Sequence, residues 1–171
     1  MENIVIRKIT CNEVESAMNL ALEVFMQFEA PDYAPSGVDT FKRDIVENPE
    51  YLENARQGIC PIYGAFDGDK IVALMGMRSS KTHINLVFTK KDYHRKGIAR
   101  AIFHYLLNDI LAEATARVQP PSDKGKRLRI YYMTQASTRP PTFVCFCNRA
   151  ELFHFSYKRY QQLQIEPKFQ V

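Results

Sequence analysis

A basic segment with a single glycine precedes the longest predicted helix of the chain. The segment reads His94-Arg95-Lys96-Gly97-Ile98-Ala99-Arg100. It follows an apolar run at His83–Phe88 that predicts a strand, and the helix expected after it covers Gly97–Ala116. Because the first N–H groups of a helix lie unpaired at the positive end of its dipole, a strand-to-helix turn of this kind binds anions. Gly97 allows close approach of the backbone, and the three basic side chains add charge that suits a diphosphate.

Hydrophobic periodicity places this turn within a series of strands and helices. The elements expected in chain order are a strand at 4–6, helices at 11–29 and around 41–46, strands at 62–66, 71–77 and 83–88, a helix at 97–116, strands at 128–134 and 142–147, and a helix at 150–163. Asp67-Gly68-Asp69 between two apolar runs predicts a β-hairpin, and Pro31–Gly37 predicts a loop. Strands mixed with crossover helices indicate an α/β or α+β fold.

Residues 1–107 resemble the GCN5-related N-acetyltransferase (GNAT) superfamily. The pyrophosphate-loop signature of that family is Gln/Arg-x-x-Gly-x-Gly/Ala. The chain has Gly97 and Ala99 at the last two key positions and His94 at the first. Tyr93 before the segment also fits the family pattern, as does the order of strands and helices. The resemblance implies a GNAT-like mixed sheet flanked by helices.

The same resemblance implies that the loop binds the diphosphate of acetyl-CoA and that the end of the preceding strand pairs with the pantetheine arm. The cofactor-binding residues implied in this way are Val87, Thr89, His94, Arg95, Lys96, Gly97, Ile98, Ala99 and Arg100. The implied reaction is acetyl transfer to an amine of a small molecule or peptide, by direct attack of the neutral amine on the thioester.

The sequence indicates the base that would deprotonate the amine less clearly than it indicates the pyrophosphate loop. Many members of the family carry a carboxylate on the strand before the loop, where this chain has Asn85. Glu29 and Asp32, where the first predicted helix passes into its loop, are substitutes by position. The alternative for each is an ordinary acid of a solvated loop.

A second resemblance begins where the first one ends. Residues 108–160 resemble the C-terminal KH-like domain of the bacterial ribosome-assembly GTPase Der (EngA). The segments that carry it are Asn108–Leu111, Pro120-Pro121, Gly125–Gln135, Thr138–Asn148 and His154–Tyr160. The chain has no G-x-x-x-x-G-K-[ST] loop and no G-x-x-G, so neither GTP binding nor the usual KH clamp on a nucleic-acid backbone is implied.

The two resemblances meet inside the predicted long helix, near residues 103–110, and indicate a chimaera. We expect residues 1–107 to form the acetyl-CoA-binding part, and residues 108–171 to form a KH-like β-β-α part that completes the same compact domain. The helix that commonly supplies the acid of the transferase is replaced. Tyr157 on the substitute helix is a candidate for that role, with packing as the alternative. We therefore expect CoA binding to survive better than turnover, with an inactive chimaeric fold as an alternative.

Charge is distributed unevenly along the chain. Residues 1–80 have a net charge of −6 and residues 81–171 a net charge of +10. An anionic partner would bind the second half, either as cofactor phosphates or as RNA held by basic and aromatic side chains. The residues of the RNA alternative are Lys124, Lys126, Arg127, Arg129, Arg139, Lys158 and Arg159, with Tyr131, Tyr132 and Phe143. An ordinary solvated basic face is the other interpretation.

Cysteine spacing and hydropathy exclude several classes of protein. Cys11, Cys60, Cys145 and Cys147 form no C-x-x-C and have no paired histidines, which favours reduced, mostly buried thiols over a zinc site or a disulfide framework. No apolar run approaches about 18 residues and no signal-peptide pattern opens the chain, so we expect no membrane span and a cytoplasmic location. An unpaired edge strand would favour a homodimer.

Overall fold

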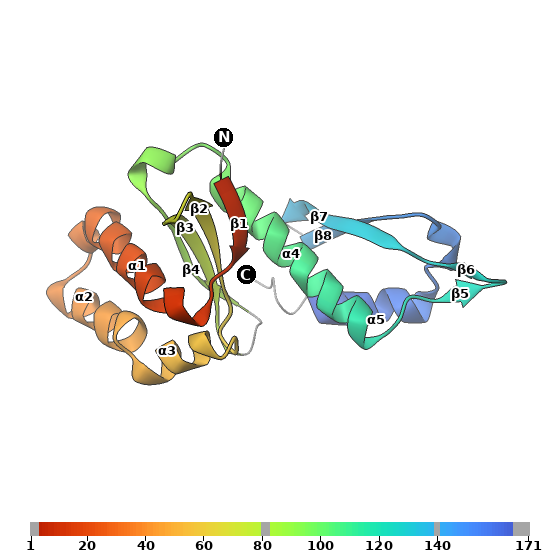
Figure 1. Cartoon of the computed structure of the whole chain (residues 1–171), viewed down its shortest axis with the longest axis horizontal. Helices are drawn as coiled ribbons and strands as arrows, with labels where there is room; N and C mark the ends of the chain where they lie inside the picture. Colours follow the sequence, from red (N-terminus) through yellow and green to blue (C-terminus); the bar gives the residue numbers. More distant parts are fainter. Residues whose placement is uncertain (1–3, 80–82, 139–140, 166–171) are drawn as a thin grey trace. The chain divides into compact units, whose positions relative to one another are not determined.

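The computed structural model describes residues 4–79, 83–138 and 141–165. The chain packs as two compact units, Met1–Phe103 and His104–Val171 (Figure 1). Arg139, which belongs to the predicted RNA-binding set, lies outside the described residues.

The first unit is built on a four-stranded sheet in the order β1-β2-β3-β4. Its strands are β1 (Ile4–Lys8), β2 (Ile62–Asp67), β3 (Lys70–Met77) and β4 (Ile84–Thr89). The predicted hairpin is confirmed: β2 and β3 pair as neighbours, and Gly68 in the turn has a φ of +59°, which glycine adopts at little cost. The resemblance implied a mixed sheet, with parallel and antiparallel pairs. Among the described strands, all three pairs of this sheet are antiparallel.

Helices precede β2 in a longer series than the sequence predicted. They are η1 (Cys11–Glu13), α1 (Val14–Phe28), η2 (Ala30–Asp32), α2 (Pro35–Phe41), the π-helical η3 (Lys42–Val46) and α3 (Pro49–Arg56). The prediction of a loop throughout Pro31–Gly37 was wrong, because Pro35 begins α2. The helix α3 was not predicted, because Pro49 was interpreted only as a stop. Proline is well tolerated in the first turn of a helix, where its missing N–H needs no partner.

The helix α1 packs against β3 and β4 and forms the centre of the first core. Its buried face follows the predicted spacing of three and four residues and includes Ala17, Ala21 and Phe25. The alanines on this face place little bulk between helix and sheet. A helix-flanked α/β arrangement, as predicted, is confirmed for this unit.

The long helix α4 (Ile98–Arg117) begins in the first unit and ends in the second. The other elements of the second unit are β5 (Ser122–Asp123), β6 (Lys126–Arg127), β7 (Ile130–Thr138), β8 (Pro141–Cys147), η5 (Ala150–Leu152) and α5 (Phe155–Ile165). The predicted β-β-α order is confirmed in β7, β8 and α5. The short β5–β6 hairpin was not predicted, and the expected last helix is divided into η5 and α5.

Buried apolar side chains and one polar anchor hold the second unit together. Leu128, Leu152 and Tyr157 form a buried cluster. The Asn108 side chain on α4 accepts a hydrogen bond from the Met133 backbone N at 3.0 Å and donates to the Met133 carbonyl at 3.4 Å. Those two bonds attach β7 to α4 through backbone groups, where the partly buried amide finds both of its partners.

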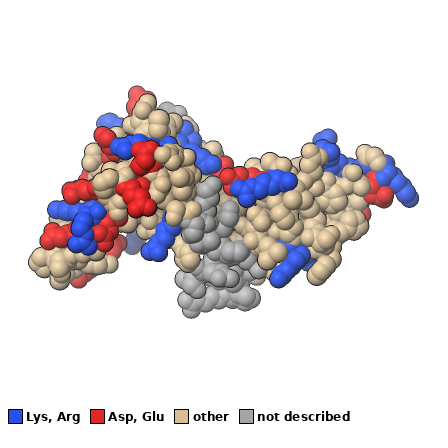
Figure 2. Space-filling model, turned by 90° about the horizontal axis from the view of Figure 1, so that it is seen from below, with Lys and Arg blue, Asp and Glu red and all other residues tan. Residues whose placement is uncertain are grey.

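On the face shown in Figure 2, acidic and basic residues are interspersed over the first unit, whereas the second unit presents mainly uncharged surface with scattered charged residues. No described helix is long and apolar enough to cross a membrane.

Candidate cofactor site

The turn between β4 and α4 has the backbone geometry of an open anion site. After β4 the chain passes through η4 (Lys91–Tyr93) and reaches α4 by two residues in the left-handed region, Arg95 at φ +59° and Gly97 at φ +73°. The first bond of the helix runs from the Ala101 N–H to the Gly97 carbonyl, at 3.0 Å. The N–H groups that precede Ala101 therefore have no acceptor inside the helix and lie at its positive end.

Side chains tie this turn to the sheet. The Tyr93 hydroxyl donates to the Asp67 carboxylate on β2 at 2.5 Å, and this bond to a carboxylate raises the pKa of Tyr93. The Nε2 atom of His94 lies 2.7 Å from the Thr89 carbonyl oxygen. Because a carbonyl can only accept, that nitrogen carries the hydrogen. The Lys96 ammonium lies 5.0 Å from the centre of the Tyr93 ring. The turn is thus held by contacts to β2 and β4 that need no ligand.

A cavity of about 520 Å³ opens beside this turn, and the first unit alone lines it. Every residue of the predicted cofactor set lines the cavity except Lys96. Arg95 and Arg100 supply positive charge, and Gly97 has nothing within 4 Å of the place where a Cβ would stand. Donors, charge and open space therefore meet at one point, which is what a diphosphate requires.

The cavity also includes residues that the sequence analysis did not single out. Val24 and Phe28, from the last turns of α1, form an apolar wall. The Phe28 ring lies 5.1 Å from the His94 ring, centre to centre. Neither Val24 nor Phe28 was among the apolar positions that predicted α1, and no sequence signal marked either residue as the wall of a cavity.

The candidate catalytic residues lie in different surroundings. Glu29 is exposed, follows α1 directly and lines the cavity, whereas Asp32 does not line it. The Oδ1 atom of Asn85 on β4 is buried without a hydrogen-bond partner among the described residues. Tyr157 belongs to the second unit, where its hydroxyl donates to the Val118 carbonyl at 3.3 Å and accepts from Gln161 at 2.9 Å. Burial raises the pKa of Tyr157, so its surroundings are those of a packed side chain.

Metal ligands do not gather anywhere in the described part of the chain. Within those residues no three His, Cys, Asp or Glu side chains come together. The four cysteines are free, but only Cys60 is buried: Cys145 and Cys147 are partly exposed and Cys11 is exposed, so the prediction that most of them are buried was wrong.

Comparison with known protein families gives two matches. The family described as acetyltransferase (GNAT) domain matches residues 29–124, more than half of the chain. The family described as KH-domain-like of EngA bacterial GTPase enzymes, C-terminal, matches residues 102–171. The two matched ranges overlap at 102–124, which includes most of α4.

Among curated proteins the chain is similar to bacterial GTPases named Der. The GTPase Der of Acetivibrio thermocellus is 64% identical over 99 residues, which cover 58% of this chain and 21% of that protein. The GTPase Der of Caldicellulosiruptor saccharolyticus is 36% identical over 143 residues, which cover 84% of this chain and 29% of that protein. The chain thus spans less than a third of the length of these relatives.

Solved structures resemble the chain in fold. The PaiA N-acetyltransferase from Thermoplasma acidophilum in complex with coenzyme A has a TM-score of 0.52 at 16% identity, and the match covers 67% of this chain and 74% of that one. A GCN5-related N-acetyltransferase from Rhodopseudomonas palustris has a TM-score of 0.53 at 14% identity, with 80% and 75% covered. At these identities the likeness concerns the fold alone. Together with the family match, it shows that the chain belongs to the acetyltransferase (GNAT) domain family and carries a C-terminal part similar to the KH-like domain of EngA.

Proposed function

We propose that the first unit binds acetyl-CoA at the N-terminus of α4 and that the protein is an acetyl-CoA-dependent N-acetyltransferase. The acceptor would be an amine of a small molecule or peptide. One observation carries the proposal: the β4 end, the basic turn and the first turn of α4 line a single cavity. The PaiA N-acetyltransferase of Thermoplasma acidophilum, which resembles the chain in fold, was solved in complex with coenzyme A, and this supports the choice of ligand.

The residues of the cavity fit the phosphate end of this ligand. The unpaired N–H groups of the first α4 turn would donate to the diphosphate, and Arg95 and Arg100 would neutralise it. The Thr89 carbonyl already accepts from His94, so Val87, which is exposed on β4, is the better backbone partner for the pantetheine arm. When bound, acetyl-CoA would supply the acetyl group as a thioester.

Glu29 is our candidate for the residue that takes the proton of the acceptor. The residue lines the cavity, so its carboxylate would take a proton from an incoming ammonium directly or through one water. Val24 and Phe28 would exclude water from the apolar wall beside it. Tyr157 is bonded within the second unit, so no acid for the leaving thiolate is assigned from the described residues.

The proposal includes a chimaeric origin of the chain. The transferase match and the KH-like match overlap at residues 102–124, which include most of α4, and α4 runs from the first unit into the second. A helix can join two such parts because its hydrogen bonds are internal to the segment. On this basis binding of the cofactor is expected to survive better than turnover, and a fold without catalysis is the alternative.

Titration of the full chain with acetyl-CoA in a calorimeter tests the proposal. We expect a dissociation constant on the order of micromolar. Gly97→Glu should abolish binding, because it adds a negative charge and strains a residue at φ +73°. Gly125→Glu is the matched control: Gly125 has a φ of +77° and equally open surroundings, but lies in the second unit. If wild-type protein gives no heat and no thermal stabilisation, the acetyl-CoA proposal fails.

A second candidate, RNA binding by the second unit, rests on an exposed aromatic face. Tyr131, Tyr132 and Phe146 are 64%, 47% and 42% exposed, and the rings of Tyr132 and Phe146 stack at 4.3 Å. A register shift between Ile130 and Tyr132 lets both tyrosines reach solvent. The exposed Arg129 precedes them. Aromatic side chains beside a cation can stack single-stranded bases.

Phe143, which the sequence analysis grouped with these tyrosines, lines a cavity of the second unit instead. Binding of single-stranded RNA should weaken steeply as salt increases, and Tyr132→Ala should reduce it. Fluorescence anisotropy over a salt series measures both effects. Salt-independent binding, or none, would leave only the transferase proposal.

A further inference from the structure

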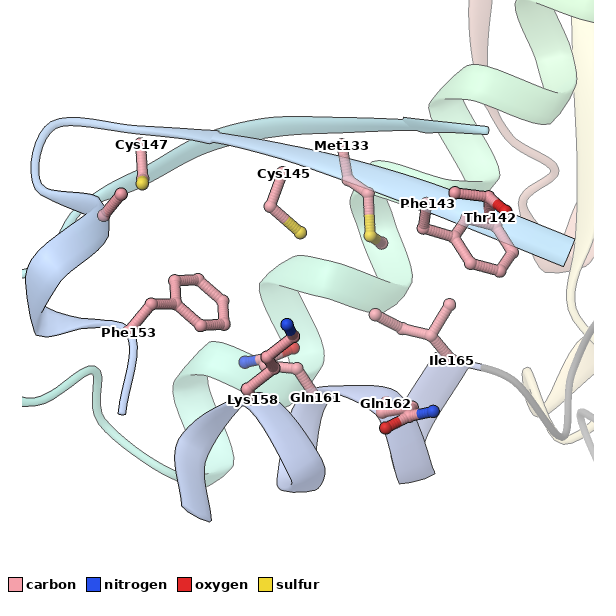
Figure 3. A pocket seen from close by; sticks show the side chains of 11 residues that line it. Met133, Thr142, Phe143, Cys145, Cys147, Phe153, Lys158, Gln161, Gln162 and Ile165 are labelled. Atoms are coloured by element: carbon pink, nitrogen blue, oxygen red, sulfur yellow. The ribbon is translucent and has the colours of Figure 1, made fainter. Parts of the chain in front are cut away.

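A second cavity, of about 510 Å³, lies between β7, β8 and α5 of the second unit. Figure 3 shows the sulfur-bearing side chains of Met133, Cys145 and Cys147 on its strand side, with Lys158 and Gln161 rising toward it from α5. Its volume falls within the range of small-molecule sites, about 300–1,000 Å³. None of the residues predicted for acetyl-CoA lines it.

Gln161 has a buried carboxamide side chain, at 3% exposure. Its Nε2 atom donates to the Tyr157 hydroxyl at 2.9 Å, and that hydroxyl donates its only hydrogen to the Val118 carbonyl at 3.3 Å. This chain of bonds fixes the orientation of the carboxamide. The Oε1 atom is therefore a buried acceptor, and it has no partner among the described residues.

A buried acceptor without a donor is costly, so it calls for an explanation. Because Gln161 lines the cavity, a ligand that enters can reach the side chain. The group needed is an N–H or O–H donor. The wall around it is mostly apolar and includes Phe143, Phe153 and Ile165, so the body of the ligand must be apolar.

Lys158 supplies a positive charge beside the cavity. It lies one helical turn before Gln161, is exposed and lines the same space. Among the described residues it has no ion-pair partner, and α5 itself carries no acidic side chain. Glu151, on η5, pairs with Arg149 at 3.3 Å. An ammonium in this position favours an anionic group on the ligand.

Side chains three positions apart on a helix are neighbours, so the anion and the donor of the ligand must lie close together. An amide N–H and a carboxylate on the same carbon meet this condition. We propose that this cavity binds an apolar amino acid whose nitrogen is acylated, with the carboxylate at Lys158, the N–H at Gln161 and the side chain among the apolar wall. The same chemistry is present at the C-terminal residue of a peptide that ends in an apolar amino acid. This inference goes beyond the proposed function and does not depend on it.

Titration of the wild-type full chain with three related compounds tests the proposal without any variant. The probe is N-acetyl-L-phenylalanine, followed by nuclear magnetic resonance of the α5 amides and of the Gln161 side-chain NH₂. N-Acetylphenylalanine amide lacks the carboxylate, and 3-phenylpropanoate lacks the N–H. We expect each of these two to bind about tenfold more weakly than the probe, because each loses one directed interaction. A short peptide ending in phenylalanine distinguishes the two sources: tighter binding of the peptide identifies a chain terminus as the ligand.

Two variants locate the interactions. Lys158→Met should weaken the probe about tenfold and leave the amide compound unchanged, which is the signature of a direct contact in a double-mutant cycle. Gln161→Met should weaken the probe but not 3-phenylpropanoate. Arg159→Met is the matched control, since Arg159 is the next residue on α5 and does not line the cavity. The proposal is overturned if the probe gives no saturable shifts, or if all three compounds bind wild-type protein equally well.

Discussion

The two cavities have nearly the same volume, about 520 and 510 Å³, and the chain builds them in different ways. Most of the first is lined by one continuous stretch, Val87–Arg100, with backbone N–H groups and arginines. The second is lined by side chains from β7, β8, η5 and α5. A site made by one contiguous turn carries its chemistry in a local motif. A site assembled from four elements carries its chemistry only in the packed fold.

We expect the two units to be separately stable, and Leu128→Ala tests this with the largest expected effect. Leu128 is fully buried in the second unit, so the truncation should cost about 2–5 kcal/mol there. Hydrogen exchange should show faster exchange of β7 and β8 amides, with those of β2 and β3 unchanged. Leu163→Ala, at a leucine that is 52% exposed, is the control. Equal loss of protection in β2 and β3 would mean that the units unfold together.

Arg95→Gly tests whether a side chain of the first cavity binds acetyl-CoA, in comparison with an equivalent substitution in the second unit. Arg95 and Lys124 are the two described non-glycine residues with positive φ, at +59° and +47°. Replacement of either by glycine should leave stability within about 1 kcal/mol of wild type, because strain is relieved while the unfolded chain gains freedom. Arg95→Gly alone should weaken acetyl-CoA binding, by about tenfold. If Lys124→Gly, in the second unit, weakens binding as much, the effect does not come from the cavity.

The smallest expected effect is the response of the first unit to acid. The Arg7 guanidinium bonds both oxygens of Glu13, at 2.8 and 2.6 Å, and lowers the pKa of that carboxyl to about 2. A carboxyl with a lowered pKa stabilises the fold above its unfolded pKa, near 4.5, and this contribution disappears as pH falls toward 2. Because the pair is partly exposed, it should contribute less than about 1 kcal/mol.

Glu13→Gln should therefore lower the melting temperature slightly at pH 7 and have no effect near pH 2. Melting curves at both pH values measure the difference, and they are followed through the amide signals of β2 and β3, which belong to the first unit. Glu15→Gln is the control, because Glu15 is exposed and pairs with Arg56 by one oxygen only. If the Glu13→Gln variant is as stable as wild type at both pH values, the Arg7–Glu13 pair does not stabilise the fold.

Much of the first unit was predictable because its signals are local. The Asp67-Gly68-Asp69 turn, the apolar spacing of α1 and the basic segment before α4 each report their structure within a few residues. The helices α2 and α3 were missed for a local reason as well. Pro35 and Pro49 were interpreted as breaks, although the same residue type can open a helix, and at α3 the Asn48 side chain caps the Tyr51 N–H at 3.0 Å.

The second cavity could not be predicted from the sequence. Gln161 looks like an ordinary polar residue of an amphipathic helix until the fold buries it at 3% exposure. The role of Tyr157 was similarly open between catalysis and packing, and its bonds to Val118 and Gln161 depend on segments 39 and 4 residues away. The homodimer and the cofactor contacts of individual residues stay predictions.

The cysteine thiols on the wall of the second cavity make it possible to detect a bound ligand by their reactivity. Cys145 and Cys147 line the cavity (Figure 3), whereas Cys11 is exposed and Cys60 is buried in the first unit. Burial raises the pKa of the Cys145 thiol, which slows its alkylation at neutral pH. A bound molecule would slow the alkylation of these two thiols further while Cys11 reacts at its own rate. The alkylation rate of Cys11 thus serves as an internal reference, and the rates of Cys145 and Cys147 relative to it measure occupancy of the cavity without any added label.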